Sequence, residues 1–128
     1  MRRTWPAGLA VAAASLAVVA FAQPPSSGDD MKRLSIERGC TTCHSDKAIK
    51  PSPSSTLPSA PSWPEIAKRY RGQAGAEDKL AAIVQTGTPK GTRHWSREAA
   101  FASMLANDAE VTPEEARSLV RWILAWPD

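Results

Sequence analysis

The chain has 128 residues, and 16 Lys and Arg side chains against 13 Asp and Glu give it a formal charge of +3. This length suffices for one small domain. Arg2 and Arg3 lie in a segment that we expect to be removed, which leaves 14 basic against 13 acidic side chains, or +1. That excess is too small to neutralise nucleic-acid phosphates, so we expect no nucleic-acid partner.

The first 22 residues have the pattern of a secretory signal peptide. A basic start, MRRTW, precedes an uncharged run of small apolar residues that ends in Ala20-Phe21-Ala22. A basic region, an apolar region and a small-x-small site together predict cleavage, here after Ala22, and a periplasmic location. The alternative is an uncleaved anchor, but the apolar run is shorter than the roughly 20 residues that a membrane span needs. After cleavage we expect no membrane association.

A flexible tail is predicted over residues 23–28 and a single domain over residues 29–128. Asp29 or Asp30 is expected to cap the first helix, because acidic side chains stabilise the positive N-terminal end of a helix.

Three further helices are predicted, separated by long loops. The segment PSPSSTLPSAPS, residues 51–62, contains four prolines and five serines, a composition typical of an extended surface loop. Capping boxes and apolar periodicity predict helices over residues 62–71, 75–87 and 112–126, with an irregular stretch over residues 88–112. Since no strand-like alternation occurs, the predicted fold class is all-α.

The motif that carries chemistry is GCTTCH, which holds the only two cysteines of the chain. Cys40 and Cys43 are three residues apart, so a helical turn presents both sulfurs on one side, and His44 follows at once. C-x-x-C-H is the attachment signature of c-type haem, in which the thiols tether the porphyrin and the imidazole ligates its iron. A redox-active dithiol would need a βαβ pattern around the motif, and none is present. A zinc site would need four protein ligands, and beyond the motif only the distant His94 is available.

The second axial ligand of the iron has more than one candidate. Met104 is favoured, because a Met/His pair is usual in c-type electron carriers. His94 would instead lower the potential, and an open position could bind a gas. Met31 lies too near the motif in sequence to reach the opposite face easily.

With these motifs in place, the chain resembles the small bacterial class I c-type cytochromes over residues 29–126. GCTTCH matches their haem-binding motif, APSWPEIAKRY their Gly-Pro-aromatic segment and following helix, QTG their Asn-Gly-Ser turn, and VTPEEARSLVRWIL their C-terminal helix. The resemblance implies a cytochrome c fold of about four short helices around one covalent haem, with Met104 as axial ligand. It also implies that the Pro61 carbonyl accepts a hydrogen bond from His44. Trp63 and Trp95 are further candidates for the haem pocket.

The chain departs from the family pattern in three places. The stretch from His44 to Pro61 is longer and contains the Pro/Ser-rich segment, the usual Met-Pro is Met104-Leu105, and the segment between Trp95 and Met104 is extended. In the family the last helix crosses the first near a close glycine and an aromatic side chain, and the matching candidates here are Gly39, Leu34, Ile36 and Trp122.

The sequence therefore predicts a periplasmic electron-transfer protein that acts with redox partner proteins and has no enzymatic activity of its own. The alternatives are a haem subunit docked to a periplasmic dehydrogenase or oxidase and, third, a gas-binding haem protein. We expect a monomer or such a subunit. Basic side chains could steer partners, or could be ordinary surface charge: Lys32, Arg38, Lys47, Lys50, Lys90, Arg93 and Arg97.

Overall fold

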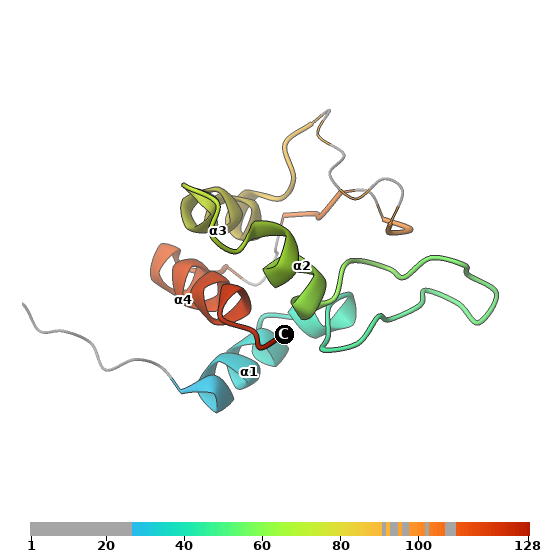
Figure 1. The fold of residues 1–128 in the computed structure, drawn as a ribbon, viewed down its shortest axis with the longest axis horizontal. Coiled ribbons are helices and arrows are strands. Elements are labelled where there is room, and N and C mark those ends of the chain that lie inside the picture. The colour runs from blue at the N-terminus through green and yellow to red at the C-terminus, as the bar shows by residue number, and fades with distance from the viewer. Residues whose placement is uncertain (1–26, 91, 93–94, 96–97, 102, 107–109) are drawn as a thin grey trace, which may run out of the picture.

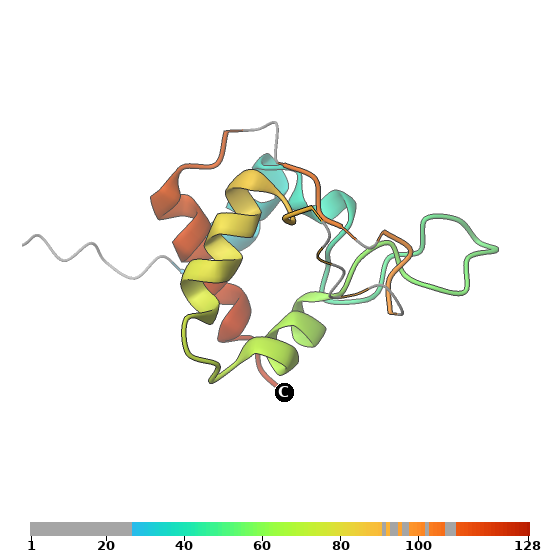
Figure 2. The same ribbon diagram turned by 90° about the horizontal axis from the view of Figure 1, so that it is seen from above.

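The regular structure of the described residues consists of four α-helices and one short 3-10 helix, with no strand (Figures 1 and 2). The computed structural model describes residues 27–90, 92, 95, 98–101, 103–106 and 110–128. The predicted signal peptide, His94, Arg93 and Arg97 lie outside these residues. No helix in the described part of the chain is both long and apolar enough to cross a bilayer.

Helix α1 spans Gly28–Glu37 and begins two or three residues earlier than a cap at Asp29 or Asp30 implies. Its N-cap is Ser27, whose hydroxyl accepts a hydrogen bond from the Asp30 backbone N–H, while the Asp30 carboxylate accepts one from the Ser27 N–H. The prediction that Asp29 or Asp30 is the cap was wrong, because Asp30 occupies the third helical position of a capping box. The 3-10 helix η1 covers Cys40–Thr42 and follows Gly39, whose φ of +72° suits a residue without a Cβ.

The other three helices lie within the predicted ranges. Helix α2 spans Trp63–Tyr70, α3 spans Ala76–Thr86, and α4 spans Pro113–Leu124. The capping boxes that open α2 and α4 are both present, as the sequence predicts. Each places a proline in the first turn, where a missing N–H does no harm.

Helix α4 is the central element, because it contacts each of the other three helices. Its buried face, with Ala116, Leu119 and Val120, packs against Ala81 of α3 and against Val111 just before α4. Where α1 approaches α4, a Cβ on Gly28 would lie 3.9 Å from Trp122 Nε1, whereas a Cβ on Gly39 would meet no atom within 4 Å. The close glycine is therefore Gly28 and not Gly39, and Ile36 is exposed.

The Pro/Ser-rich segment is a long loop that extends away from the helices (Figures 1 and 2). We call residues 45–60 the insert. A hydrogen bond of 2.6 Å from the Ser59 N–H to the Ile49 carbonyl closes its base. Irregular structure is observed here, as the composition predicts.

Candidate haem site

The two cysteines and the histidine lie on one tight turn. The N–H groups of Cys43 and His44 both donate to the Cys40 carbonyl, at 3.3 and 3.0 Å. Neither cysteine forms a disulfide, and both are half-buried. Burial raises the pKa of the Cys40 thiol. The two thiols and the imidazole of this turn line two adjoining cavities between the helices.

The His44 ring is oriented from two sides. Its Nδ1–H donates a hydrogen bond of 2.7 Å to the Pro61 carbonyl, and its face stacks on Trp63 with ring centroids 4.9 Å apart and planes at 21°. With Nδ1 carrying the proton, Nε2 is the nitrogen that can ligate a metal. Burial lowers the pKa of His44, and the Pro61 bond partly opposes that shift. The imidazole is therefore held neutral, the form in which it ligates iron.

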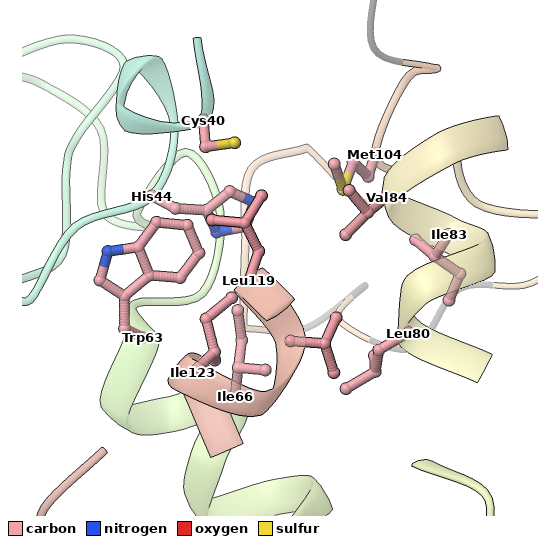
Figure 3. Close-up of a pocket in the computed structure, with 11 residues that line it drawn as sticks. Cys40, His44, Trp63, Ile66, Leu80, Ile83, Val84, Met104, Leu119 and Ile123 are labelled. Carbon is pink, nitrogen blue, oxygen red and sulfur yellow. The ribbon is translucent and has the colours of Figure 1, made fainter. Parts of the chain in front are cut away.

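Met104 lies across the cavity from His44 (Figure 3). Thr88 holds its backbone through two hydrogen bonds: the Thr88 Oγ1 accepts from the Met104 N–H at 2.9 Å, and the Thr88 N–H donates to the Met104 carbonyl at 2.8 Å. Gly87, at φ +78°, lies so close that a Cβ there would be 2.7 Å from Ala106 N. The sequence places Gly87 at the end of a predicted helix and in the QTG turn, and it gives no sign of the role of Thr88.

A cavity of about 910 Å³ separates the two potential ligands, and a smaller one of about 70 Å³ lies beside it under α4. The volume of the larger cavity is in the range of small-molecule and cofactor sites. Most of the lining is apolar and comes from α2, α3, α4 and the loop around Met104, through Ile66, Tyr70, Leu80, Ile83, Val84, Phe101, Leu105, Leu119, Val120 and Ile123. Such a lining suits a large flat macrocycle, so the residues present fit a haem.

The structure brings all seven predicted site residues to these two cavities: Cys40, Cys43, His44, Pro61, Trp63, Trp95 and Met104. Met31 is buried in α1 and does not line either cavity. Of the basic residues that could steer partners, Arg38 lines the larger cavity and is paired with Glu115 at 2.7 Å, while Lys32, Lys47, Lys50 and Lys90 are exposed.

Residues 29–126 match the family model described as cytochrome c. The chain therefore belongs to the cytochrome c family. It is 39% identical over 98 residues to cytochrome c2 of Rhodocyclus tenuis, covering 75% of this chain and 91% of that protein. It is 31% identical over 109 residues to cytochrome c-551 of Allochromatium vinosum, covering 85% of this chain and 98% of that protein.

Among solved structures, the chain resembles the class 1 cytochrome MtoD from Sideroxydans lithotrophicus ES-1, with a TM-score of 0.50 and 29% identity over 76% of this chain and 92% of that one. The predicted family and the all-α cytochrome c fold are thereby confirmed. The protein is a small class I c-type cytochrome of the electron-carrier kind, and it carries covalent haem c with its iron.

Proposed function

We propose that this protein is a periplasmic one-electron carrier in which His44 and Met104 are the axial ligands of the haem iron and Cys40 and Cys43 form the thioether bonds. The observation that carries the proposal is the placement of the His44 imidazole and the Met104 thioether on opposite sides of one apolar cavity (Figure 3).

Haem c supplies a one-electron couple when it is bound, and the side chains around it tune that couple. The Pro61 carbonyl makes His44 more basic by accepting its Nδ1–H. The Met104 thioether is a soft ligand that raises the reduction potential. The apolar lining excludes water, which keeps the change in solvation small when the charge of the site changes. No acid–base chemistry is required of any side chain, as expected for a carrier rather than an enzyme.

Redox partner proteins would approach where the cavity reaches the surface. Phe101 and Leu105 line the larger cavity and remain 56% and 84% exposed. Electron-transfer contacts are small and transient, so an apolar rim that consists of the two exposed side chains Phe101 and Leu105 suits them. The same rim favours, as a second candidate, a haem subunit docked to a periplasmic dehydrogenase or oxidase. Elution of the purified holoprotein at its monomer mass supports the free carrier, and cell fractionation tests the periplasmic location.

The axial ligand is tested by the pair Met104→Leu and Met31→Leu. Both changes conserve volume and remove one thioether. Met104→Leu should lower the midpoint potential, abolish the methionine-to-iron charge-transfer absorption and give high-spin ferric iron, because the sixth position loses its protein ligand. Met31→Leu should leave the spectrum and the potential unchanged. An unaltered ferric spectrum in Met104→Leu would refute the assignment, and electronic spectroscopy with redox titration measures both outcomes.

A further inference from the structure

Described residues between α3 and Met104, the proposed sixth ligand, contact two other parts of the molecule, α2 and the insert. We call the described residues of the stretch 88–106 the ligand loop. Its far end is fixed by Thr88, as described above, and its middle lies three to nine residues before Met104 along the chain. The described residues of that middle, Trp95 and residues 98–101, contact α2 on one side and the insert on the other.

Helix α2 contributes Arg69. Its guanidinium carbon lies 3.9 Å from the centroid of the Trp95 ring, and its Nη2 lies 3.7 Å from Glu98 Oε1. The Trp95 carbonyl accepts hydrogen bonds from the N–H groups of Glu98 and Ala99, at 3.2 and 2.9 Å, so these residues form one turn. Trp95 also lines the larger cavity, so Arg69 contacts a residue of the haem site.

The insert contributes its returning segment. The Pro58 carbonyl accepts from the Ala100 N–H at 2.7 Å, and the Ser59 carbonyl accepts from the Phe101 N–H at 3.1 Å. Ser59 and the neighbouring Ala99 are buried, at 4% and 3% exposed, whereas the side chains of Ala100 and Phe101 are exposed. The ribbon shows the insert and the ligand loop side by side where these bonds form (Figure 2).

We propose that Arg69, together with Pro58 and Ser59, forms a clamp that positions the ligand loop and thereby keeps Met104 on the iron. The two extensions that distinguish this chain from the family pattern, the insert and the segment between Trp95 and Met104, are the parts that meet in this clamp. Among its described residues the middle of the ligand loop forms one turn, at Trp95 to Ala99, and the clamp adds contacts to the insert and to α2. This inference rests on the proposed His44/Met104 ligation.

The test measures how easily an added ligand displaces Met104 in the ferric holoprotein. The apparent affinity for imidazole rises with the fraction of molecules in which Met104 has left the iron. Arg69→Gln removes both the cation over Trp95 and the pair with Glu98, so imidazole should bind about three- to tenfold more tightly than in the wild type. Arg69→Lys retains a cation, so its affinity for imidazole should lie between those of the wild type and Arg69→Gln.

Two further variants separate positioning from general stability. Arg121→Gln removes a comparable ion pair, to Glu77 at 3.2 Å, which joins α4 to α3, and should leave imidazole affinity unchanged. Ala100→Pro removes the N–H that donates to the Pro58 carbonyl and should raise imidazole affinity in the same direction as Arg69→Gln. Urea unfolding of each holoprotein shows whether the fold as a whole is affected.

Equal imidazole affinity in wild type, Arg69→Gln and Ala100→Pro would overturn the clamp. So would an equal rise in Arg69→Gln and Arg121→Gln, because the effect would then be general. A wild-type ferric spectrum without the methionine charge-transfer absorption would instead remove the proposed ligation, and the clamp with it. The wild-type spectrum therefore distinguishes the two failures before any variant is compared.

Discussion

At the scale of single residues, the haem site depends on neighbours that orient the ligands without touching the metal. Pro61 fixes which nitrogen of His44 is available, and Trp63 fixes the plane of its ring. Thr88 uses its N–H and its hydroxyl to hold both backbone groups of Met104. Each ligand therefore has its own support, one from the chain before α2 and the other from the end of α3.

Gly87 offers a prediction at this scale. Its φ of +78° disfavours a side chain, and a Cβ would lie 2.7 Å from Ala106 N and 2.9 Å from the Met104 carbonyl oxygen. Gly87→Ala should destabilise the holoprotein by about 2 kcal/mol or more from backbone strain and contact. It should also weaken the methionine charge-transfer absorption and lower the midpoint potential, because the backbone of residues 104–106 must move away.

Gly75→Ala is the matched control for this change. Gly75 also has a positive φ, +73°, but a Cβ there would meet no atom within 4 Å. This variant should lose about 1–2 kcal/mol of stability from the left-handed conformation alone and keep the wild-type potential. If Gly87→Ala also keeps that potential, the contact with the Met104 backbone does not position the ligand.

At the scale of elements, α1 and α4 are joined by a charged contact as well as by apolar packing. Arg38, just past the end of α1, lies 2.7 Å from the Glu115 carboxylate in the first turn of α4. The hydrogen bond from Arg38, with a second from the Thr112 N–H, lowers the pKa of Glu115 below its ordinary value. The ion pair links the helix that leads into the cysteine turn to the central helix.

The pH dependence of this contact follows from the direction of that shift. Because the pKa of Glu115 is lower in the folded state, the ion pair stabilises the fold above the ordinary glutamate pKa, and this stabilisation is lost as the pH falls through the lowered pKa. A double-mutant cycle with Arg38→Gln and Glu115→Gln, followed by urea unfolding, should give a favourable coupling at neutral pH and none in acid.

The pair Arg71 and Asp128 provides the comparison. It has the same separation, 2.7 Å, but the Asp128 side chain is 90% exposed, so its coupling at neutral pH should be the smaller of the two. Equal coupling in both pairs at neutral pH, or coupling at Arg38 and Glu115 that persists in acid, would contradict this account.

Local chemistry made most elements predictable from the sequence. The boxes at Ser62 and Thr112 each consist of a hydroxyl residue and a glutamate three positions later, so the starts of α2 and α4 were predicted to within a residue. Ser27 with Asp30 is the same arrangement with a shorter acid, and the sequence analysis assigned the cap to the aspartates instead. C-x-x-C-H predicted the haem because the two thiols that attach it and the imidazole that ligates its iron lie within five consecutive residues.

Contacts between distant loops could not be predicted in this way. The backbone part of the clamp uses the carbonyls of residues 58 and 59, which any residue type can provide, and the N–H groups of residues 100 and 101, which every type except proline can provide. No side-chain pattern therefore predicts it. Thr88 was missed for a similar reason, because its partner is the backbone of Met104. Gly39 was expected to permit a close approach between helices, but its positive φ is what the turn requires.

At the scale of the whole molecule, the polypeptide has only a small apolar core of its own. Six of the thirteen buried apolar residues among those described are alanines: Ala60, Ala67, Ala76, Ala81, Ala99 and Ala116. The larger side chains of α2, α3 and α4 face the cavities instead. Domains of about 100 residues are marginal when their burial is limited, so much of the apolar contact of this fold must be made with the haem.

Removal of the haem attachment should therefore unfold most of the chain. A Cys40→Ser/Cys43→Ser variant, produced without haem, should lose most of its helical circular dichroism at 25 °C, because about 910 Å³ of apolar-lined space would fill with water. The wild-type holoprotein, purified in the same way, is the control. A haem-free variant that retained the far-ultraviolet spectrum and cooperative unfolding of the holoprotein would show that the helices pack adequately on their own.

The stacking of Trp63 on His44 extends into a row of indoles. The Trp63 and Trp122 rings lie 5.9 Å apart, and Trp122 and Trp126 lie 5.0 Å apart, each pair edge to face. Since haem absorbs at the wavelengths at which indole emits, the porphyrin beside Trp63 should quench this row by energy transfer while the fold is intact. The protein thus contains a built-in optical reporter, whose emission should brighten when α2, α4 and the cysteine turn separate.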